Sequence, residues 1–81
     1  MTDTSTAVRA RILELCQQRQ ITINRLATIS GVTQSTLNNI ISGRNNSTTV
    51  ATIKKLCDGL DITLRDFFDV SAFDHLEQEI R

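Results

Sequence analysis

The sequence has no proline, tryptophan or tyrosine, and its 81 residues include only three glycines, three phenylalanines and two cysteines. Such scarcity of proline and glycine excludes collagen-like and low-complexity chains, and it disfavours an all-β fold, which needs many turns. No apolar run approaches the roughly 20 residues of a membrane-spanning helix, and the N-terminus lacks the charged-then-apolar pattern of a signal peptide. We therefore expect a single domain over residues 1–81 that stays in the cytoplasm and has no membrane partner.

The residues that most often carry catalysis or bind metals are also few. Cys16 and Cys57 are too isolated for a disulfide framework or a zinc site, which needs paired spacings with more Cys or His. We expect both thiols to act as small core side chains. The single histidine, His75, has no Cys or Ser partner near it in the sequence. We predict no enzymatic activity, no cofactor, no metal site and no small-molecule ligand.

The formal net charge is zero, but the charges are distributed unevenly along the chain. No Asp or Glu occurs from Leu15 through Cys57, a stretch that contains five Lys and Arg residues. From Asp58 onward, seven acidic residues face only two arginines. This asymmetry predicts one surface that attracts phosphates and another that repels them.

Apolar residues recur with helical spacing in five segments, each preceded by a polar residue suited to capping a helix. The first cap is Thr4, Ser5 or Thr6, and Thr63 with Asp66 resembles a capping box. The expected helices run from the first cap to residues 19–21, from Thr22 to Ser30, from Thr33 to Ser42, from Thr49 to Leu60, and from Thr63 through Phe68. Gly31 and Gly43 end the second and third by adopting a left-handed conformation.

A sixth short helix is expected to open at Ser71, with Phe73, Leu76 and Ile80 on one side. Two outcomes are open for residues 70–81. They pack against their own bundle, or they form the self-complementary patch of a two-fold dimer. The fold prediction is all-α, a compact five-helix bundle with a short C-terminal sixth helix.

Residues 22–42 contain the pattern most informative about function. Two short helices are separated by a tight break made of Gly31, the apolar Val32 and the cap Thr33, which is the layout of a helix-turn-helix. Packing of the apolar residues leaves amides and hydroxyls on the other side of the second of these helices, namely Gln34, Ser35, Asn38 and Asn39. Every exposed helix surface must be polar, but the glycine turn and the absence of carboxylates favour a surface for DNA. A helix fits the major groove, and Gln or Asn can pair with adenine there.

Two segments of the chain are predicted to bind phosphates. Backbone N–H groups around Thr22 and Asn24 begin a helix, where they and the helix dipole attract anions. Arg44, Asn45 and Asn46 follow the third helix and are placed to hold a neighbouring phosphate. For Arg44, a merely solvated loop arginine is an equally acceptable interpretation.

Over residues 11–69 the chain resembles the Cro/repressor-type helix-turn-helix family, also called the XRE family. The matching residues are Ile23–Asn24–Arg25–Leu26–Ala27, Ser30–Gly31–Val32–Thr33, Ser35–Thr36–Leu37, Ile40, Gly43–Arg44, Ile53, Leu56, Leu60–Asp61–Ile62–Thr63–Leu64 and Asp66–Phe67–Phe68. The resemblance implies a lambda-repressor-like bundle that places its third helix in the major groove, often as a dimer on a palindromic site.

The resemblance also implies roles for individual residues. Gln34, Ser35 and Asn39 match base-facing positions, and Asn38 lies between the two classes. The phosphate-facing positions are Thr22, Asn24, Thr33, Thr36 and Arg44. The chain departs from the family at Ile23, where a glutamine often braces a recognition residue, and at Asp61, where glycine is usual. Since the third helix has no Lys or Arg, we expect modest affinity per subunit.

The predicted function is sequence-specific binding of double-stranded DNA by a bacterial or phage transcriptional regulator, a repressor rather than an activator. The helix at residues 33–42 enters the major groove, and a homodimer binds a palindromic operator. Two alternatives are an antitoxin-like protein-interaction module and a helix-turn-helix bundle that does not bind DNA.

Overall fold

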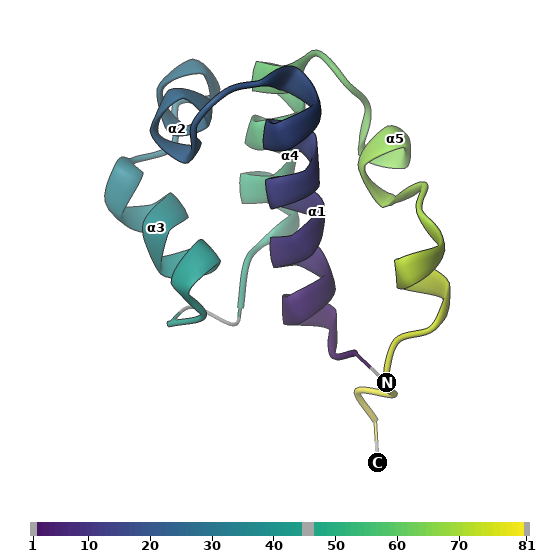
Figure 1. Cartoon of the computed structure of the whole chain (residues 1–81). Helices are drawn as coiled ribbons and strands as arrows, with labels where there is room; N and C mark the ends of the chain where they lie inside the picture. The colour runs from purple at the N-terminus through teal and green to yellow at the C-terminus, as the bar shows by residue number, and fades with distance from the viewer. Residues whose placement is uncertain (1, 45–46, 81) are drawn as a thin grey trace.

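The computed structural model describes residues 2–44 and 47–80 (Figure 1). These residues form five α-helices and one short 3-10 helix, with no strand among them, as the all-α prediction requires. The elements are α1 (Thr4–Arg19), α2 (Ile23–Ser30), α3 (Gln34–Ser42), α4 (Val50–Leu60), α5 (Leu64–Phe68) and η1 (Ser71–Asp74). Within the described ranges, no helix is both long enough and apolar enough to span a membrane.

Threonine caps start four of the helices, as predicted. The hydroxyl oxygens of Thr22, Thr33, Thr49 and Thr63 each accept the N–H of the residue three positions on, at 3.0–3.1 Å. The cap predicted for α1 is wrong, because Asp3 occupies that position. Its carboxylate accepts the Thr6 N–H at 2.8 Å, and this bond lowers the pKa of Asp3. A charged acceptor makes a stronger hydrogen bond than the neighbouring hydroxyls would.

Left-handed residues end the first four helices. Gly31 (φ 68°) and Gly43 (φ 84°) terminate α2 and α3 as expected, since glycine adopts this conformation without steric cost. Asp61 takes the same role after α4 with φ 56°, as does Gln20 after α1. After Gly31 the chain turns inward, and the Val32 N–H donates to the Ala27 carbonyl at 3.1 Å. The helix ends are therefore fixed by local chemistry.

One hydrophobic core joins α1 to α5. Its buried members are Val8, Ile12, Leu15, Cys16, Leu26, Ala27, Leu37, Ile40, Ile53, Leu56, Cys57, Leu60 and Phe67. The two cysteines lie there as free thiols, as predicted, and burial raises the pKa of both. Ile29 and Val50 are apolar residues of α2 and α4 that lie outside this core and are exposed. In this core α2 packs against both α3 and α4, which joins the helix-turn-helix to the rest of the bundle.

Arg11 ties α1 to the end of the five-residue helix α5. Its Nε donates to the Phe67 carbonyl at 2.6 Å and its Nη2 to the Asp66 carbonyl at 2.8 Å, while Nη1 pairs with Glu14. The side chain is only 10% exposed. The last carbonyl groups of a helix have no N–H partner within the helix, and here the guanidinium of Arg11 donates its N–H groups to two of them. Arg11 thereby keeps the Phe67 ring in the core.

The C-terminal segment differs from the predicted helix. The 3-10 helix η1 ends at Asp74, and Phe73 packs against Phe67 and Phe68 with ring centroids 6.3 and 4.9 Å apart. Leu76 instead forms a parallel β-bridge with Thr2. Ile80 is 85% exposed. Of the two outcomes left open, packing against the bundle therefore holds for Phe73.

Hydrogen bonds to the start of the chain explain why the helix stops. The Glu77 N–H donates to the Thr2 carbonyl at 3.0 Å, and the Thr4 hydroxyl donates to Glu79 Oε1 at 2.8 Å. Both bonds join the start of the chain to residues beyond His75, where the backbone is no longer helical. The N- and C-terminal segments consequently run together along one end of the molecule (Figure 1).

Candidate nucleic-acid interface

The exposed side of α3 bears the residues that the sequence predicted to read bases. Gln34, Ser35 and Asn38 are exposed, and Asn39 is half-buried. Leu37 and Ile40 point the opposite way, into the core. Because residues four apart in a helix lie one above the other, Gln34 and Asn38 form a short column of amides. Neither amide has a hydrogen-bond partner in the described part of the chain, so both can bind an external group.

The threonines near the start of α3 are engaged with one another. Thr33 Oγ1 accepts the Thr36 N–H at 3.1 Å and donates its own proton to Thr36 Oγ1 at 2.8 Å. The Thr33 hydroxyl is thus fully engaged within the helix cap and has no proton left to donate to a ligand. The Thr36 hydroxyl, on a half-buried side chain, keeps a proton to donate. This difference between the two threonines was not predicted from the sequence.

The start of α2 offers backbone N–H groups. The Arg25 N–H donates to Thr22 Oγ1 and the Leu26 N–H to the Thr22 carbonyl, both at 3.0 Å. The N–H groups of Ile23 and Asn24 precede these and have no partner among the described residues. They lie at the positive end of the α2 dipole, where anions are stabilised. The Thr22 hydroxyl is occupied as a cap, so the backbone is the stronger anion-binding group here.

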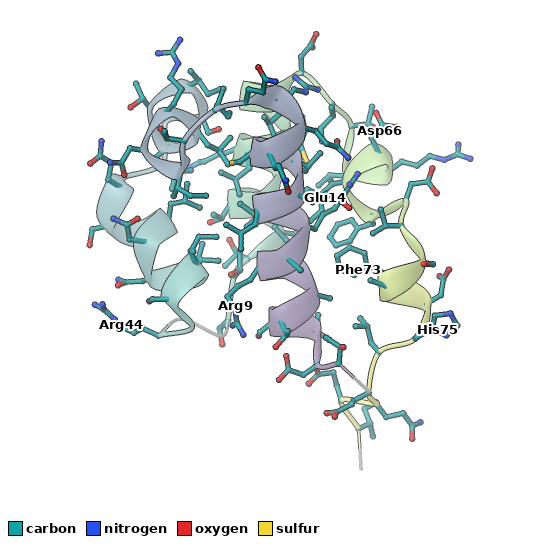
Figure 2. The ribbon with its side chains drawn as sticks, viewed as in Figure 1. Arg9, Glu14, Arg44, Asp66, Phe73 and His75 are labelled. Atoms are coloured by element: carbon teal, nitrogen blue, oxygen red, sulfur yellow. The ribbon has the colours of Figure 1, made fainter. Side chains whose placement is uncertain are left out.

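Arg44 follows the cap residue Gly43 and is exposed. Figure 2 shows its side chain at the C-terminal end of α3, directed away from the bundle. Asn45 and Asn46, predicted as its neighbours in phosphate binding, lie outside the described residues. The guanidinium of Arg9, on α1, reaches the same end of α3. This position of Arg9 was not predicted from the sequence. A Cβ built on Gly43 would lie 3.6 Å from Arg9 Nη1.

Most of the Lys and Arg residues between Leu15 and Cys57, the part of the chain without Asp or Glu, form no ion pair within the described part of the molecule. Lys54 forms an ion pair with Asp58 one turn along α4. Over residues 2–44 and 47–80, the structure gives no carboxylate partner to Arg19, Arg25, Arg44 or Lys55. Seven of the nine acidic residues lie from Asp58 onward, at the end of α4 and in the part of the chain that follows it. The charge separation seen in the sequence is therefore largely retained in the folded molecule.

Together, the short helices α2 and α3, the glycine turn and the exposed amides define a DNA-binding helix-turn-helix domain. Residues 11–72 match the model of the Cro/C1-type HTH DNA-binding domain, and the chain belongs to this family. Both the predicted bundle and the predicted family are thereby confirmed.

Two individual proteins are similar over most of the chain. An uncharacterized HTH-type transcriptional regulator of Bacillus subtilis (strain 168), RghRB, is 32% identical over 74 residues, which are 88% of this chain and 52% of that protein. The chain thus spans about half the length of this curated relative. The crystal structure of the prophage Lp1 protein 11 superposes with a TM-score of 0.81 at 38% identity, covering 94% of this chain and all of that one.

Proposed function

We propose that the chain binds double-stranded DNA in a sequence-specific manner by placing α3 in the major groove. The observation that carries the proposal is the exposed column of Gln34 and Asn38 beside Ser35, on a helix whose other side is held in the core. A groove about 12 Å wide admits such a helix, and amide groups can form paired hydrogen bonds with base edges. Membership of a DNA-binding family supports the same conclusion.

In this proposal the contacts divide into two classes. Bases are read by Gln34, Ser35, Asn38 and Asn39. Phosphates are held by Thr22, Asn24, Thr33, Thr36 and Arg44, together with Asn45 and Asn46 beyond the described residues. Beside Thr22, the unpaired N–H groups of Ile23 and Asn24 supply the attraction, whereas Thr36 donates its hydroxyl and Arg44 its charge. The Thr33 hydroxyl, which donates to Thr36, orients that group. Phosphate contacts orient the domain, and base contacts select the sequence.

The regulatory role proposed here is repression by occupancy, since a bound domain can block access to a promoter without chemistry. We further propose a homodimer on a palindromic operator. Two-fold symmetry would place two copies of α3 about 34 Å apart, one turn of DNA. Because α3 has no cation, one module gains little from phosphates, and linking two binding events raises the overall affinity.

Selection from a random-duplex pool at fixed salt tests the proposal. We expect enrichment of a repeated half-site, and anisotropy titrations should give tighter binding to the selected duplex than to its scrambled version. The logarithm of affinity should fall linearly with the logarithm of salt concentration. Failure to enrich any sequence would contradict the proposal and favour a protein-binding role. Sedimentation with and without the duplex reports the oligomeric state.

A further inference from the structure

The side chains of α3 restrict which base pairs the helix can read. The helix contains no Lys or Arg, whose paired donors are the commonest readers of guanine, and no carboxylate to accept from cytosine. Its reading groups are therefore amides and hydroxyls alone.

Hydrogen bonding within the helix reduces this set further. The Thr33 hydroxyl is spent on Thr36, and the Ser42 hydroxyl donates to the Asn39 carbonyl at 3.2 Å. Asn39 is half-buried, whereas Gln34 and Asn38 are exposed. Of the three amides, those of Gln34 and Asn38 are therefore the most accessible to a groove, with the Ser35 hydroxyl beside them.

Each amide offers one acceptor, its oxygen, and a donor NH2 group side by side. The major-groove edge of adenine presents the complementary pair, the N7 acceptor and the N6 donor. Guanine presents two acceptors, so the amide oxygen would face another acceptor. The amides therefore both favour adenine and disfavour guanine.

The spacing along the helix fixes the spacing of the base pairs. Four residues rise about 6 Å along an α-helix, and successive base pairs are about 3.4 Å apart. Gln34 and Asn38 are thus separated by about two base-pair steps when α3 follows the groove.

We infer that each operator half-site has two A·T pairs about two steps apart, one read by the Gln34 amide and one by the Asn38 amide. This inference rests on the proposed function, because it requires α3 to lie in the major groove. Guanines required by the operator lie outside these two positions.

The test uses the full chain and the duplex selected from a random pool. Each of the two A·T pairs is replaced in turn by inosine·cytosine, which presents the major-groove pattern of G·C but keeps the minor-groove pattern of A·T. We expect each replacement to weaken binding by about 5- to 150-fold, the value of one paired contact. Gln34→Ala should abolish the preference at one of the two positions, and Gln34→Arg should change it from adenine to guanine. Gln78→Ala, in the exposed tail, is the control and should change nothing.

Three results distinguish this inference from the function on which it rests. Enrichment of the two A·T pairs, with sensitivity to inosine, supports it. A selected site with G·C at those positions, or one indifferent to inosine, overturns the inference and leaves sequence-specific binding intact. A pool in which nothing is enriched overturns both.

Discussion

Gly59 of α4 lies directly against Ser30, the last residue of α2. A Cβ built on Gly59 would come 3.0 Å from the Ser30 Cα and 3.1 Å from the Ile29 carbonyl oxygen, with the Ser30 Oγ closer still. Both backbone contacts are tighter than nine in ten real Cβ contacts, so the two helices approach this closely because Gly59 has no side chain. This contact between Gly59 and the end of α2 packs the helix-turn-helix against α4.

The first prediction is that Gly59→Ala lowers the free energy of unfolding by about 1–3 kcal/mol, the usual cost of overpacking. Alanine is the better helix former, so intrinsic propensity alone predicts the opposite sign. Urea denaturation followed by circular dichroism measures the difference. A gain in stability would show that α2 and α4 can separate at no cost.

Ser30→Ala provides the matched background for this test. The Ser30 Oγ is buried without a partner in the described structure, and an unsatisfied hydroxyl costs free energy. Its removal should leave stability unchanged or raise it by up to about 1 kcal/mol. In the double variant the Gly59→Ala penalty should shrink, because the nearest atom is gone, but not vanish, because the Ser30 Cα and the Ile29 oxygen remain.

The second prediction concerns the link between α1 and α5. Arg11→Met should lower the free energy of unfolding by about 2 kcal/mol, because the carbonyls of Asp66 and Phe67 lose charged donors. Arg65→Met, at an exposed position of α5, should change it by less than about 0.5 kcal/mol. Equal effects of the two substitutions would mean that Arg11 acts through net charge and not through its hydrogen bonds.

The third prediction separates phosphate binding from base reading. Arg44→Ala should weaken binding to all duplexes alike and make the salt slope shallower by about one unit. Gln34→Ala should instead reduce discrimination among duplexes, with the salt slope unchanged. Arg65→Ala removes a charge from the acidic side of the molecule and serves as the control. An unchanged slope in Arg44→Ala would remove Arg44 from the phosphate contacts.

The fourth prediction is a pH dependence at the start of α1. The hydrogen bond from the Thr6 N–H lowers the pKa of Asp3 below 3.8, so the folded protein favours the ionised carboxylate. The contribution of Asp3 to stability is present above the unfolded-state pKa and is lost as the pH falls through the folded-state value. Unfolding free energies of the wild type and Asp3→Asn should differ near pH 7, and the difference should shrink as the pH falls below the ordinary pKa of an aspartate. A constant difference across this range would exclude titration of Asp3 as the cause.

Signals that lie close together in the sequence predicted the fold best. Thr22, Thr33, Thr49 and Thr63 each cap a helix through an N–H only three residues away. Gly31 and Gly43 stop helices by a property of their own backbone. Helical periodicity alone predicted that Leu37 is buried while Gln34 and Asn38 are exposed.

Features that depend on distant partners were missed. One local feature was missed as well: the cap Asp3, because the three hydroxyl residues that follow it also fit a cap. The approach of Arg9 to Gly43 and the bonds from Arg11 to α5 join segments that periodicity treats separately. Leu76 and Ile80 fit a helical pattern, but the N-terminal segment offers them an extended alternative.

The bridge between Thr2 and Leu76 has a consequence for anything attached to this domain. The described segments nearest the two ends of the chain lie side by side, at a distance from α3 in Figure 1. A fluorophore, affinity tag or further domain fused to either end would leave from the same corner and would not cover the amide column. A short peptide joining the two ends would close the backbone into a ring, with the DNA-facing helix still free.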